Sequence, residues 1–177
     1  LPNVKRTGYA LDALVDPKNI KMLVNQQVFT EKEIRSRYLI KLEQYITTLQ
    51  IETEAFCDLV ETRVLPAALQ YQHQLARTVA SLVKVEQVIA GTSLQHQKNL
   101  LRTVSEQIDL LMTGVEQIKT KRREMHALKE LSTQAKFVAD HMVDLLEAVR
   151  KPADELEHLI PDADWPLPKY QEMLFIL

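Results

Sequence analysis

Hydrophobic residues recur at helical spacing along one long stretch of the chain, residues 30–89. Thr30 followed by Glu33 has the form of a capping box, in which each side chain accepts the other's backbone amide, so a helix is predicted to begin there. About sixty residues then pass before Gly91, which is expected to end the helix, and the one proline among them, Pro66, is expected to kink it. Apolar residues three, four or seven positions apart predict one buried stripe, formed by Ile34, Tyr38, Leu42, Tyr45, Leu49, Phe56 and Leu59.

Two further helices follow in the pattern. The second carries a heptad seam with the 3-4-3-4-3 spacing of a coiled coil, made of Leu101, Val104, Ile108, Leu111, Val115 and Ile118. Gly114 lies beside this seam, where it is tolerable if it permits close approach, and the helix is expected to end near residues 123–127. The third seam runs on in register through Pro152, which indicates a kink or a restart rather than a loop, and consists of Leu131, Ala135, Val138, Met142, Leu145, Val149, Leu156 and Leu159.

The two ends of the chain lack the long helical pattern of the residues between them. Residues 1–29 are short pieces broken by prolines and a glycine, in which Thr7 is a possible cap and Asp16 before Pro17 is a good start for a helix over residues 18–24. Residues 161–177 include Pro166 and Pro168, which favour an extended backbone at residues 165–168. This tail also holds the only tryptophan, so it is expected to pack on the bundle or on a neighbouring domain.

These patterns predict an all-α fold, a long antiparallel three-helix bundle resembling a coiled coil, kinked at Pro66 and Pro152. Three glycines and 6% aromatic residues are few for a sheet protein. The predicted organisation is a connector or end of a preceding domain over residues 1–29, a helical bundle over 30–160 and an apolar tail over 161–177. Because the chain begins with Leu-Pro-Asn and not with methionine, we expect it to be part of a longer protein.

Charge and cysteine content narrow the function classes. A formal net charge of -2 gives no electrostatic reason to expect nucleic acid or an anionic membrane as a partner. No apolar run approaches the length that spans a bilayer. The single cysteine, Cys57, excludes an internal disulfide and fits a cytoplasmic location.

Three candidate sites of chemistry are weak. A di-iron bundle needs two Glu-x-x-His motifs, and this chain has only Glu155 with His158. Cys57 beside a helix seam is more typical of a small core residue than of a nucleophile. The basic run at Lys119, Lys121, Arg122 and Arg123 suits the end of a helix better than a nucleic-acid patch, since no aromatic residue is interleaved with it. No metal ligand or catalytic residue is therefore predicted.

Some polar and aromatic residues are candidates for partner contact. Cations and tyrosines share the first predicted helix, which is too long to be covered by one small domain. They form either a contact surface, which we favour, or a solvated face with half-buried rings. The candidate contact residues here and in the tail are Arg35, Arg37, Tyr38, Tyr45, Trp165 and Tyr170.

Several segments, in order along the chain, resemble the region that follows the catalytic domain of type III glutamine synthetases. The early segments are residues 13–20 (ALVDPKNI), 36–38 (SRY), 42–45 (LEQY), 51–52 (IE) and 65–68 (LPAA), and the late ones are 152–157 (PADELE) and 165–170 (WPLPKY). Residues 72–148 resemble the corresponding region of that family only in their helical pattern and share no motif with it. Gly8-Tyr9 departs from the proline-containing helix start expected of the family.

The resemblance implies a parent enzyme that joins ammonia to glutamate with ATP and divalent metal, assembled from stacked hexameric rings. It also implies that the catalytic, nucleotide-binding and metal-binding residues belong to upstream domains, so that no cofactor is expected in this chain. Our leading hypothesis is a non-catalytic helical C-terminal domain that contacts its own catalytic domain or neighbouring subunits of a homo-oligomer. The alternatives are a free-standing coiled-coil adaptor and a metal-binding helical enzyme.

Overall fold

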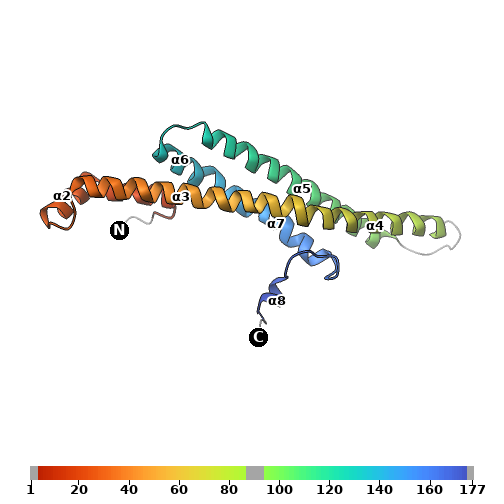
Figure 1. The fold of residues 1–177 in the computed structure, drawn as a ribbon. Coiled ribbons are helices and arrows are strands. Elements are labelled where there is room, and N and C mark those ends of the chain that lie inside the picture. Colours follow the sequence, from red (N-terminus) through yellow and green to blue (C-terminus); the bar gives the residue numbers. More distant parts are fainter. Residues whose placement is uncertain (1–3, 87–93, 175–177) are drawn as a thin grey trace. The chain divides into compact units, whose positions relative to one another are not determined.

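Every regular element that the structure describes is helical (Figure 1). The structure is a computed structural model that describes residues 4–86 and 94–174, apart from the side chains at positions 85, 86, 170 and 171. The α-helices are α1 (Thr7–Ala10), α2 (Pro17–Asn25), α3 (Glu31–Leu59), α4 (Leu65–Glu86), α5 (Gln95–His126), α6 (Leu131–Phe137), α7 (Val143–Leu159) and α8 (Tyr170–Leu174). A 3-10 helix, η1 (Leu11–Val15), and two π-helical segments, η2 (Val60–Val64) and η3 (Val138–Met142), lie between them. The predicted all-α class is confirmed.

The chain forms two compact units. Unit 1 consists of Leu1–Ala55 and Gln117–Leu146, and unit 2 of Phe56–Glu116 and Glu147–Leu177. Helices α3, α5 and α7 each contribute residues to both units. The antiparallel three-helix arrangement and the division at residues 29 and 160 stay predictions.

The core of unit 1 lies between the first part of α3, the end of α5, α6 and η3. Apolar side chains from these elements are almost completely buried: Ile34, Leu42, Ile46, Ile118, Met125, Ala135, Val138, Ala139 and Met142. One polar residue, Thr53, is buried among them, and its hydroxyl donates to the Gln50 carbonyl of the preceding turn at 2.9 Å. The buried hydroxyl is thus satisfied within its own helix.

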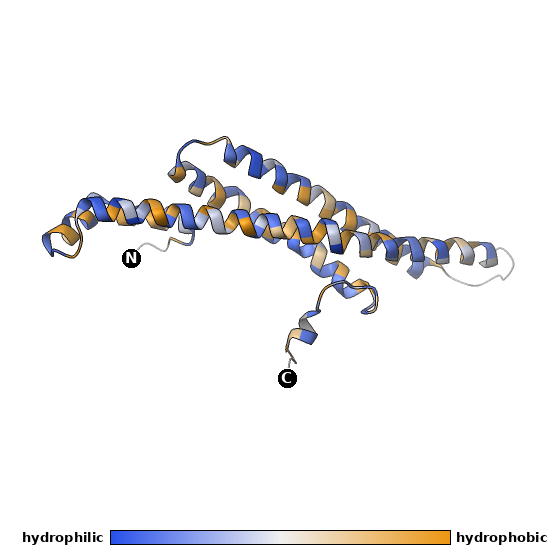
Figure 2. Cartoon of the chain, in the orientation of Figure 1, coloured by the Kyte–Doolittle hydropathy of each residue, from blue (hydrophilic) through white to orange (hydrophobic). Residues whose placement is uncertain are grey.

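The core of unit 2 is formed by the end of α3, η2, α4, α5, α7 and the turn that follows α7. Its buried side chains are Cys57, Val60, Val64, Ala68, Leu94, Val104, Ile108, Leu111, Val115, Val149, Leu156, Ile160 and Trp165. Gln72 on α4 donates to the Ser105 hydroxyl on α5 at 2.8 Å. Figure 2 shows hydrophobic and hydrophilic residues alternating along these helices, as expected of amphipathic elements.

Two of the three predicted helix starts that the structure describes are confirmed. Before α3, the Thr30 amide donates to the Glu33 carboxylate at 2.8 Å and the Glu33 amide donates to the Thr30 hydroxyl at 3.3 Å, which is the expected capping box. Asp16 caps α2, with its carboxylate accepting from the Lys18 amide at 2.8 Å and Pro17 in the first turn. Thr7 is not a cap, because Arg6 takes the N-cap position of α1. The expected stop at Gly91 and the capping residues after it lie outside the described residues.

The predicted seams differ in accuracy. On α5 all members except the half-buried Leu101 are buried, and the helix ends at His126 as expected. On α3 the predicted stripe is wrong at Leu59, which is 44% exposed, while Thr53 and Cys57, and Val60 at the start of η2, are buried instead. The neighbours of this long helix change along its length, since it passes from unit 1 to unit 2 after Ala55, so its buried face does not follow the single stripe that was predicted.

The backbone near Pro66 is π-helical. Pro66 is the second residue of α4, and the Leu65 amide just before it donates to the Val60 carbonyl, five residues back. A π turn widens the backbone ahead of the proline ring, which would otherwise crowd the preceding turn of an α-helix. Pro152 is buried inside α7, so the helix continues through it as predicted and does not form a loop. The bends expected at both prolines stay predictions.

The tail is only partly extended. The amides of Asp164 and Trp165 donate to the Pro161 carbonyl, which makes a turn that places the Trp165 ring in the core of unit 2. Contrary to the extended tail that was predicted, α8 forms after Pro168. The Lys169 amide donates to the Glu172 carboxylate at 3.1 Å, which supports the start of a helix once the prolines have passed.

Candidate contact surfaces

No group of three or more histidine, cysteine, aspartate or glutamate residues is arranged to hold a metal ion in the part of the chain that the structure describes. In the same part, none of the helices combines the length and hydrophobicity needed to cross a membrane. The most elaborate polar arrangement joins the N-terminal helices to α6, η3 and α7 within unit 1.

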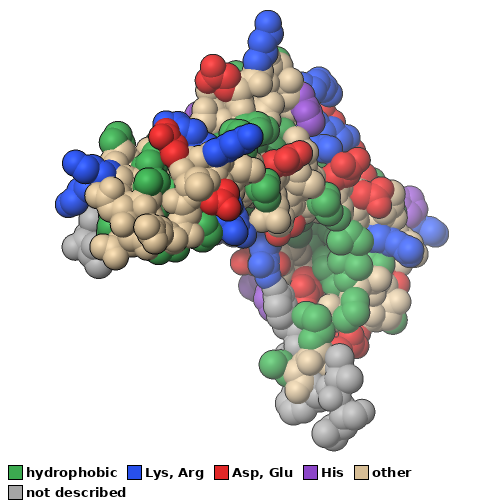
Figure 3. Space-filling view, turned by 60° about the vertical axis from the view of Figure 1, so that its left-hand side comes forward, with side chains coloured by type: hydrophobic (Ala, Val, Ile, Leu, Met, Phe, Trp, Pro, Cys, Tyr) green, Lys and Arg blue, Asp and Glu red, His purple; other side chains and the backbone are tan. Residues whose placement is uncertain are grey.

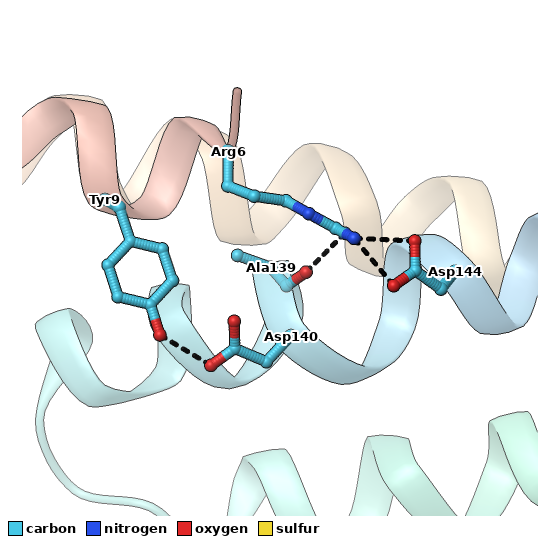
Figure 4. Close-up of polar contacts among 5 residues, drawn as sticks. All are labelled: Arg6, Tyr9, Ala139, Asp140 and Asp144. Atoms are coloured by element: carbon cyan, nitrogen blue, oxygen red, sulfur yellow. Dashed lines mark hydrogen bonds and ion pairs between the residues drawn. The ribbon is translucent and has the colours of Figure 1, made fainter. Parts of the chain in front are cut away.

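The first half of this arrangement involves Arg6 and Tyr9 (Figure 4). The Arg6 guanidinium donates to the Ala139 carbonyl and to both carboxylate oxygens of Asp144, each at 2.6 Å. The Tyr9 hydroxyl donates to Asp140 at 2.6 Å. These hydrogen bonds raise the pKa of Arg6 and of Tyr9 above their ordinary values.

The second half centres on Asp12. Its carboxylate pairs with the Lys136 ammonium at 2.9 Å and accepts from the Tyr38 hydroxyl at 2.9 Å. The hydrogen bond from Lys136 is the main reason that the pKa of Asp12 lies below its ordinary value. We call the set Arg6, Tyr9, Asp12, Lys136, Asp140 and Asp144 the N-terminal latch.

Close backbone packing accompanies the latch. A Cβ added to Gly8 would lie 2.6 Å from the Ala135 carbonyl oxygen and 3.2 Å from the Ala139 Cβ. Because the nearest atom belongs to the backbone, it cannot move aside as a flexible side chain would. Only glycine at position 8 therefore allows α1 to lie this close to α6 and η3.

Two of the predicted contact residues, Arg35 and Arg37, are exposed on α3. The Arg35 guanidinium donates to the Glu31 carboxylate one turn earlier, at 2.9 and 2.7 Å. The Arg37 guanidinium lies over the Phe29 ring, 4.6 Å from its centre. Both arginines are thus oriented by neighbours on their own segment, and both keep an accessible surface.

The predicted tyrosines Tyr38 and Tyr45 face the N-terminal latch. Burial, reinforced by the hydrogen bond to Asp12, raises the pKa of Tyr38 to about 12. Burial also raises the pKa of Tyr45, while the Arg6 guanidinium lowers it and the Asp140 carboxylate raises it. The structure therefore brings these two tyrosines together with latch residues inside unit 1.

The two predicted contact residues of the tail belong to unit 2. Trp165 is buried, and its indole Nε1 is buried without a hydrogen-bond partner in the structure. The side chain of Tyr170 lies outside the described part of the chain. The role of all six residues in contact with a partner stays a prediction.

The environment of Tyr38 predicts an alkaline effect on stability. Its folded-state pKa exceeds the unfolded value near 10, so the neutral hydroxyl stabilises the fold below pH 10, and this contribution is lost as the pH rises towards about 12. Tyr38→Phe should lower the free energy of unfolding by about 1 kcal/mol at pH 8. Urea denaturation from pH 7 to 12 should show parallel curves up to pH 9.5 and a steeper decline for the wild type above it. Equal slopes above pH 10 would contradict the assignment.

Two cations of the basic run near the end of α5, Lys121 and Arg122, are paired within unit 1. Lys121 bonds Glu124 at 2.7 Å and lies near the Phe137 ring, and Arg122 bonds Glu54 at 3.1 Å. These partners support the structural interpretation of the run over a nucleic-acid patch.

Exposed apolar side chains also occur on the helices, and Figure 3 shows such side chains lying among charged ones on one face. Leu39, Ile40 and Ile51 are exposed on α3 in unit 1, with Ile51 62% exposed. Leu110 and Met112 are exposed on α5 in unit 2. Contiguous apolar patches mark contact sites, whereas single exposed apolar side chains are ordinary on protein surfaces.

Sequence reasoning missed the N-terminal latch completely. Arg6 and Asp144 are separated by 138 positions, and Tyr9 and Asp140 by 131. Single charged residues on amphipathic helices carry no signal of their tertiary partners. The one usable hint was Gly8, because a glycine inside a short helix indicates a close approach.

The chain is similar to known proteins of one kind. Residues 1–83 match the family model of the glutamine synthetase C-terminal domain. Over 99% of its length the chain is 30% identical to a type-3 glutamine synthetase of Dictyostelium discoideum, of which it covers 24%. It is 28% identical to a glutamine synthetase of Bacteroides fragilis, with 99% of this chain and 24% of that protein covered. For a glutamine synthetase of Butyrivibrio fibrisolvens the identity is 23%, with 100% and 25% covered.

The chain therefore spans about a quarter of the length of the curated relatives it matches. The family model and the relatives agree with the resemblance carried by the sequence motifs. This chain is similar over its length to type-3 glutamine synthetases, and its residues 1–83 match the glutamine synthetase C-terminal domain.

Proposed function

We propose that this chain is the non-catalytic C-terminal domain of a type III glutamine synthetase, and that it contacts the catalytic domain of its own protein or neighbouring subunits of a homo-oligomer. The observation that carries the proposal is the alignment of 99% of the chain with about a quarter of a type-3 glutamine synthetase. The parent reaction is the ATP-dependent ligation of ammonia to glutamate. Upstream domains bind the ATP and divalent metal, and the protein is cytoplasmic.

The surface of the helices supports a contact role. Leu39, Ile40, Ile51 and Leu110 present exposed apolar side chains although each unit has its own buried core. Burial of such side chains contributes about 25 cal/mol per Å² of apolar area removed from water. A helical domain with this surface gains stability when another protein part covers it.

A free-standing coiled-coil adaptor is the second candidate, favoured by the heptad seam buried on α5. The two candidates differ in what adjoins this chain in the native protein. Mass spectrometry of the native protein should find a polypeptide about four times as long, as in the relatives. A native polypeptide of this length alone would favour the adaptor.

The non-catalytic role predicts no glutamine formation by the isolated chain. A coupled assay with glutamate, ammonia, ATP and magnesium or manganese should give the rate of a protein-free blank. The longer enzyme, assayed in parallel, should form glutamine. ATP-dependent synthesis by the isolated chain would contradict the role.

The contact role predicts a loss of assembly when the domain is removed. Deleting residues 30–177 from the longer enzyme should shift its mass in light scattering to smaller species. Ile51→Glu should weaken assembly in the same direction, because a charge replaces a side chain that is 62% exposed. Ser36→Glu is the matched control, since it adds the same charge at an exposed polar position of α3. Unchanged assembly and activity after the deletion would contradict the role.

A further inference from the structure

A groove lies between the N-terminal helices and the start of α3 in unit 1. It has a volume of about 360 Å³ and is lined by residues from η1, α2 and α3: Val15, Pro17, Ile20, Lys21, Val24, Asn25, Glu31 and Arg35. This volume lies in the range of pockets that hold a few side chains of a ligand. The groove includes Arg35, one of the contact residues predicted from the sequence.

The floor and one wall of the groove are apolar. Ile20 is only 9% exposed and forms the buried part, while Val24 is 40% exposed on the same face of α2. Exposed apolar side chains also lie next to the groove in the sequence, at Met22 and Val28. An apolar floor of this kind suits a side chain of a protein segment better than a small ion.

The carboxylates near the groove are already in use. Asp16 accepts from the Lys18 amide at 2.8 Å, and Glu33 belongs to the capping box of Thr30. Glu31 pairs with Arg35 at 2.7 Å. Each of these three carboxylates therefore already accepts a hydrogen bond at a helix start or forms an ion pair.

The two cations that line the groove, Lys21 and Arg35, are not both paired with a carboxylate. Among the residues that the structure describes, the ammonium group of Lys21 has no hydrogen-bond or ion-pair partner, although Lys21 lines the groove and is exposed. Arg35 uses two of its nitrogens on a single oxygen of Glu31. The groove thus presents one uncompensated positive charge beside an apolar floor.

We infer that this groove docks a segment of protein chain that places an apolar side chain on Ile20 and Val24 and an aspartate or glutamate next to Lys21. The inference rests on the proposed function in one respect, in that it takes the segment from the same glutamine synthetase assembly. An apolar anchor fills the groove, and the neighbouring carboxylate fixes the direction of the segment by pairing with the ammonium.

Photo-crosslinking in the intact protein tests the inference. Benzoylphenylalanine replaces Val24, whose partial exposure lets a larger ring be accommodated, and the crosslinked peptide is identified by mass spectrometry. The expected product is one segment of the assembly with a large apolar residue within three positions of an aspartate or glutamate. Circular dichroism checks that the substituted protein keeps its helical content.

Charge reversal provides the control. Lys21→Glu should reduce the yield of that crosslink by about fivefold or more, because repulsion replaces an ion pair. Lys98→Glu on α5 makes the same change at another exposed lysine and should leave the yield unchanged.

Four outcomes would decide the matter. No crosslink above that of the wild-type protein, a crosslinked segment without an acidic residue, or a yield indifferent to Lys21→Glu would each overturn the docking inference. None of these three outcomes would contradict the proposed role of the domain, which the deletion of residues 30–177 tests separately. A crosslink to an apolar and acidic segment of a different protein would support the docking chemistry and contradict the assignment of its source.

Discussion

Leu111→Ala is expected to lower the free energy of unfolding of this chain by about 2–5 kcal/mol. Leu111 is 0% exposed in the seam of α5, so truncation removes buried methyl groups and leaves a cavity in the core of unit 2. Urea denaturation followed by circular dichroism would measure the loss, with the wild type measured alongside.

The chain offers a matched control one position away. Leu110 is 56% exposed on the same helix, so Leu110→Ala makes the same chemical change at the same intrinsic helix propensity without opening a cavity. It should change the free energy of unfolding by about 0.5 kcal/mol or less. Equal losses in the two variants would mean that the α5 seam is not the buried side of the helix.

Gly114→Ala is expected to lower the free energy of unfolding by about 1–2 kcal/mol. Alanine favours a helix over glycine by about 1 kcal/mol, but overpacking of a core costs roughly 1–3 kcal/mol or more. The added Cβ would lie 2.7 Å from Val149 Cγ1 and 3.1 Å from its Cβ. A β-branched side chain in a helix has little rotamer freedom, so Val149 on α7 cannot turn away.

A double-mutant cycle isolates this contact. Val149→Ala alone should destabilise the chain by creating a cavity, but in that background Gly114→Ala should no longer cost stability, because the clashing methyl groups are absent. Thermal and urea denaturation of the four proteins would give the coupling energy. If Gly114→Ala stabilises the wild type by its helix propensity, α5 and α7 do not approach as closely as the structure shows.

Local signals in the sequence predicted much of the fold. The Thr30 and Glu33 capping box, the Asp16 cap and the heptad seam of α5 each depend on residues within a few turns of one another, and each is confirmed. The close approach that would make Gly114 tolerable beside the seam is also observed, since Val149 of α7 occupies the space where a side chain at position 114 would lie. Periodicity and capping chemistry are sufficient for such features because one helix contains all of the information.

Features that depend on tertiary context were not predicted. The buried face of α3 passes through Thr53 and Cys57 and leaves Leu59 exposed, because the neighbours of a long helix change along its length. The π-helical η3 contains neither proline nor glycine, so nothing in its sequence marks it. The N-terminal latch joins charges from distant segments, and a sequence alone does not specify which of many surface charges meet.

The candidate contact residues illustrate the same limit. Cations and tyrosines on one helix indicated a surface rich in polar anchors, but their spacing did not show which of them the protein uses internally. Tyr38 is bonded to Asp12, whereas Arg35 lines a groove with an open side. The distinction comes from the N-terminal helices, which cover one part of α3 and leave another accessible.

The composition of unit 1 has a consequence for synthesis on the ribosome. Its two segments, Leu1–Ala55 and Gln117–Leu146, are separated by all of the intervening chain. At roughly 5–20 residues per second, translation takes on the order of ten seconds to pass from the first segment to the end of the second. Throughout that delay Ile34, Leu42 and Ile46 of the nascent chain lack the residues of the second segment that later help to bury them. The nascent chain is therefore exposed to aggregation until the second segment has been synthesised.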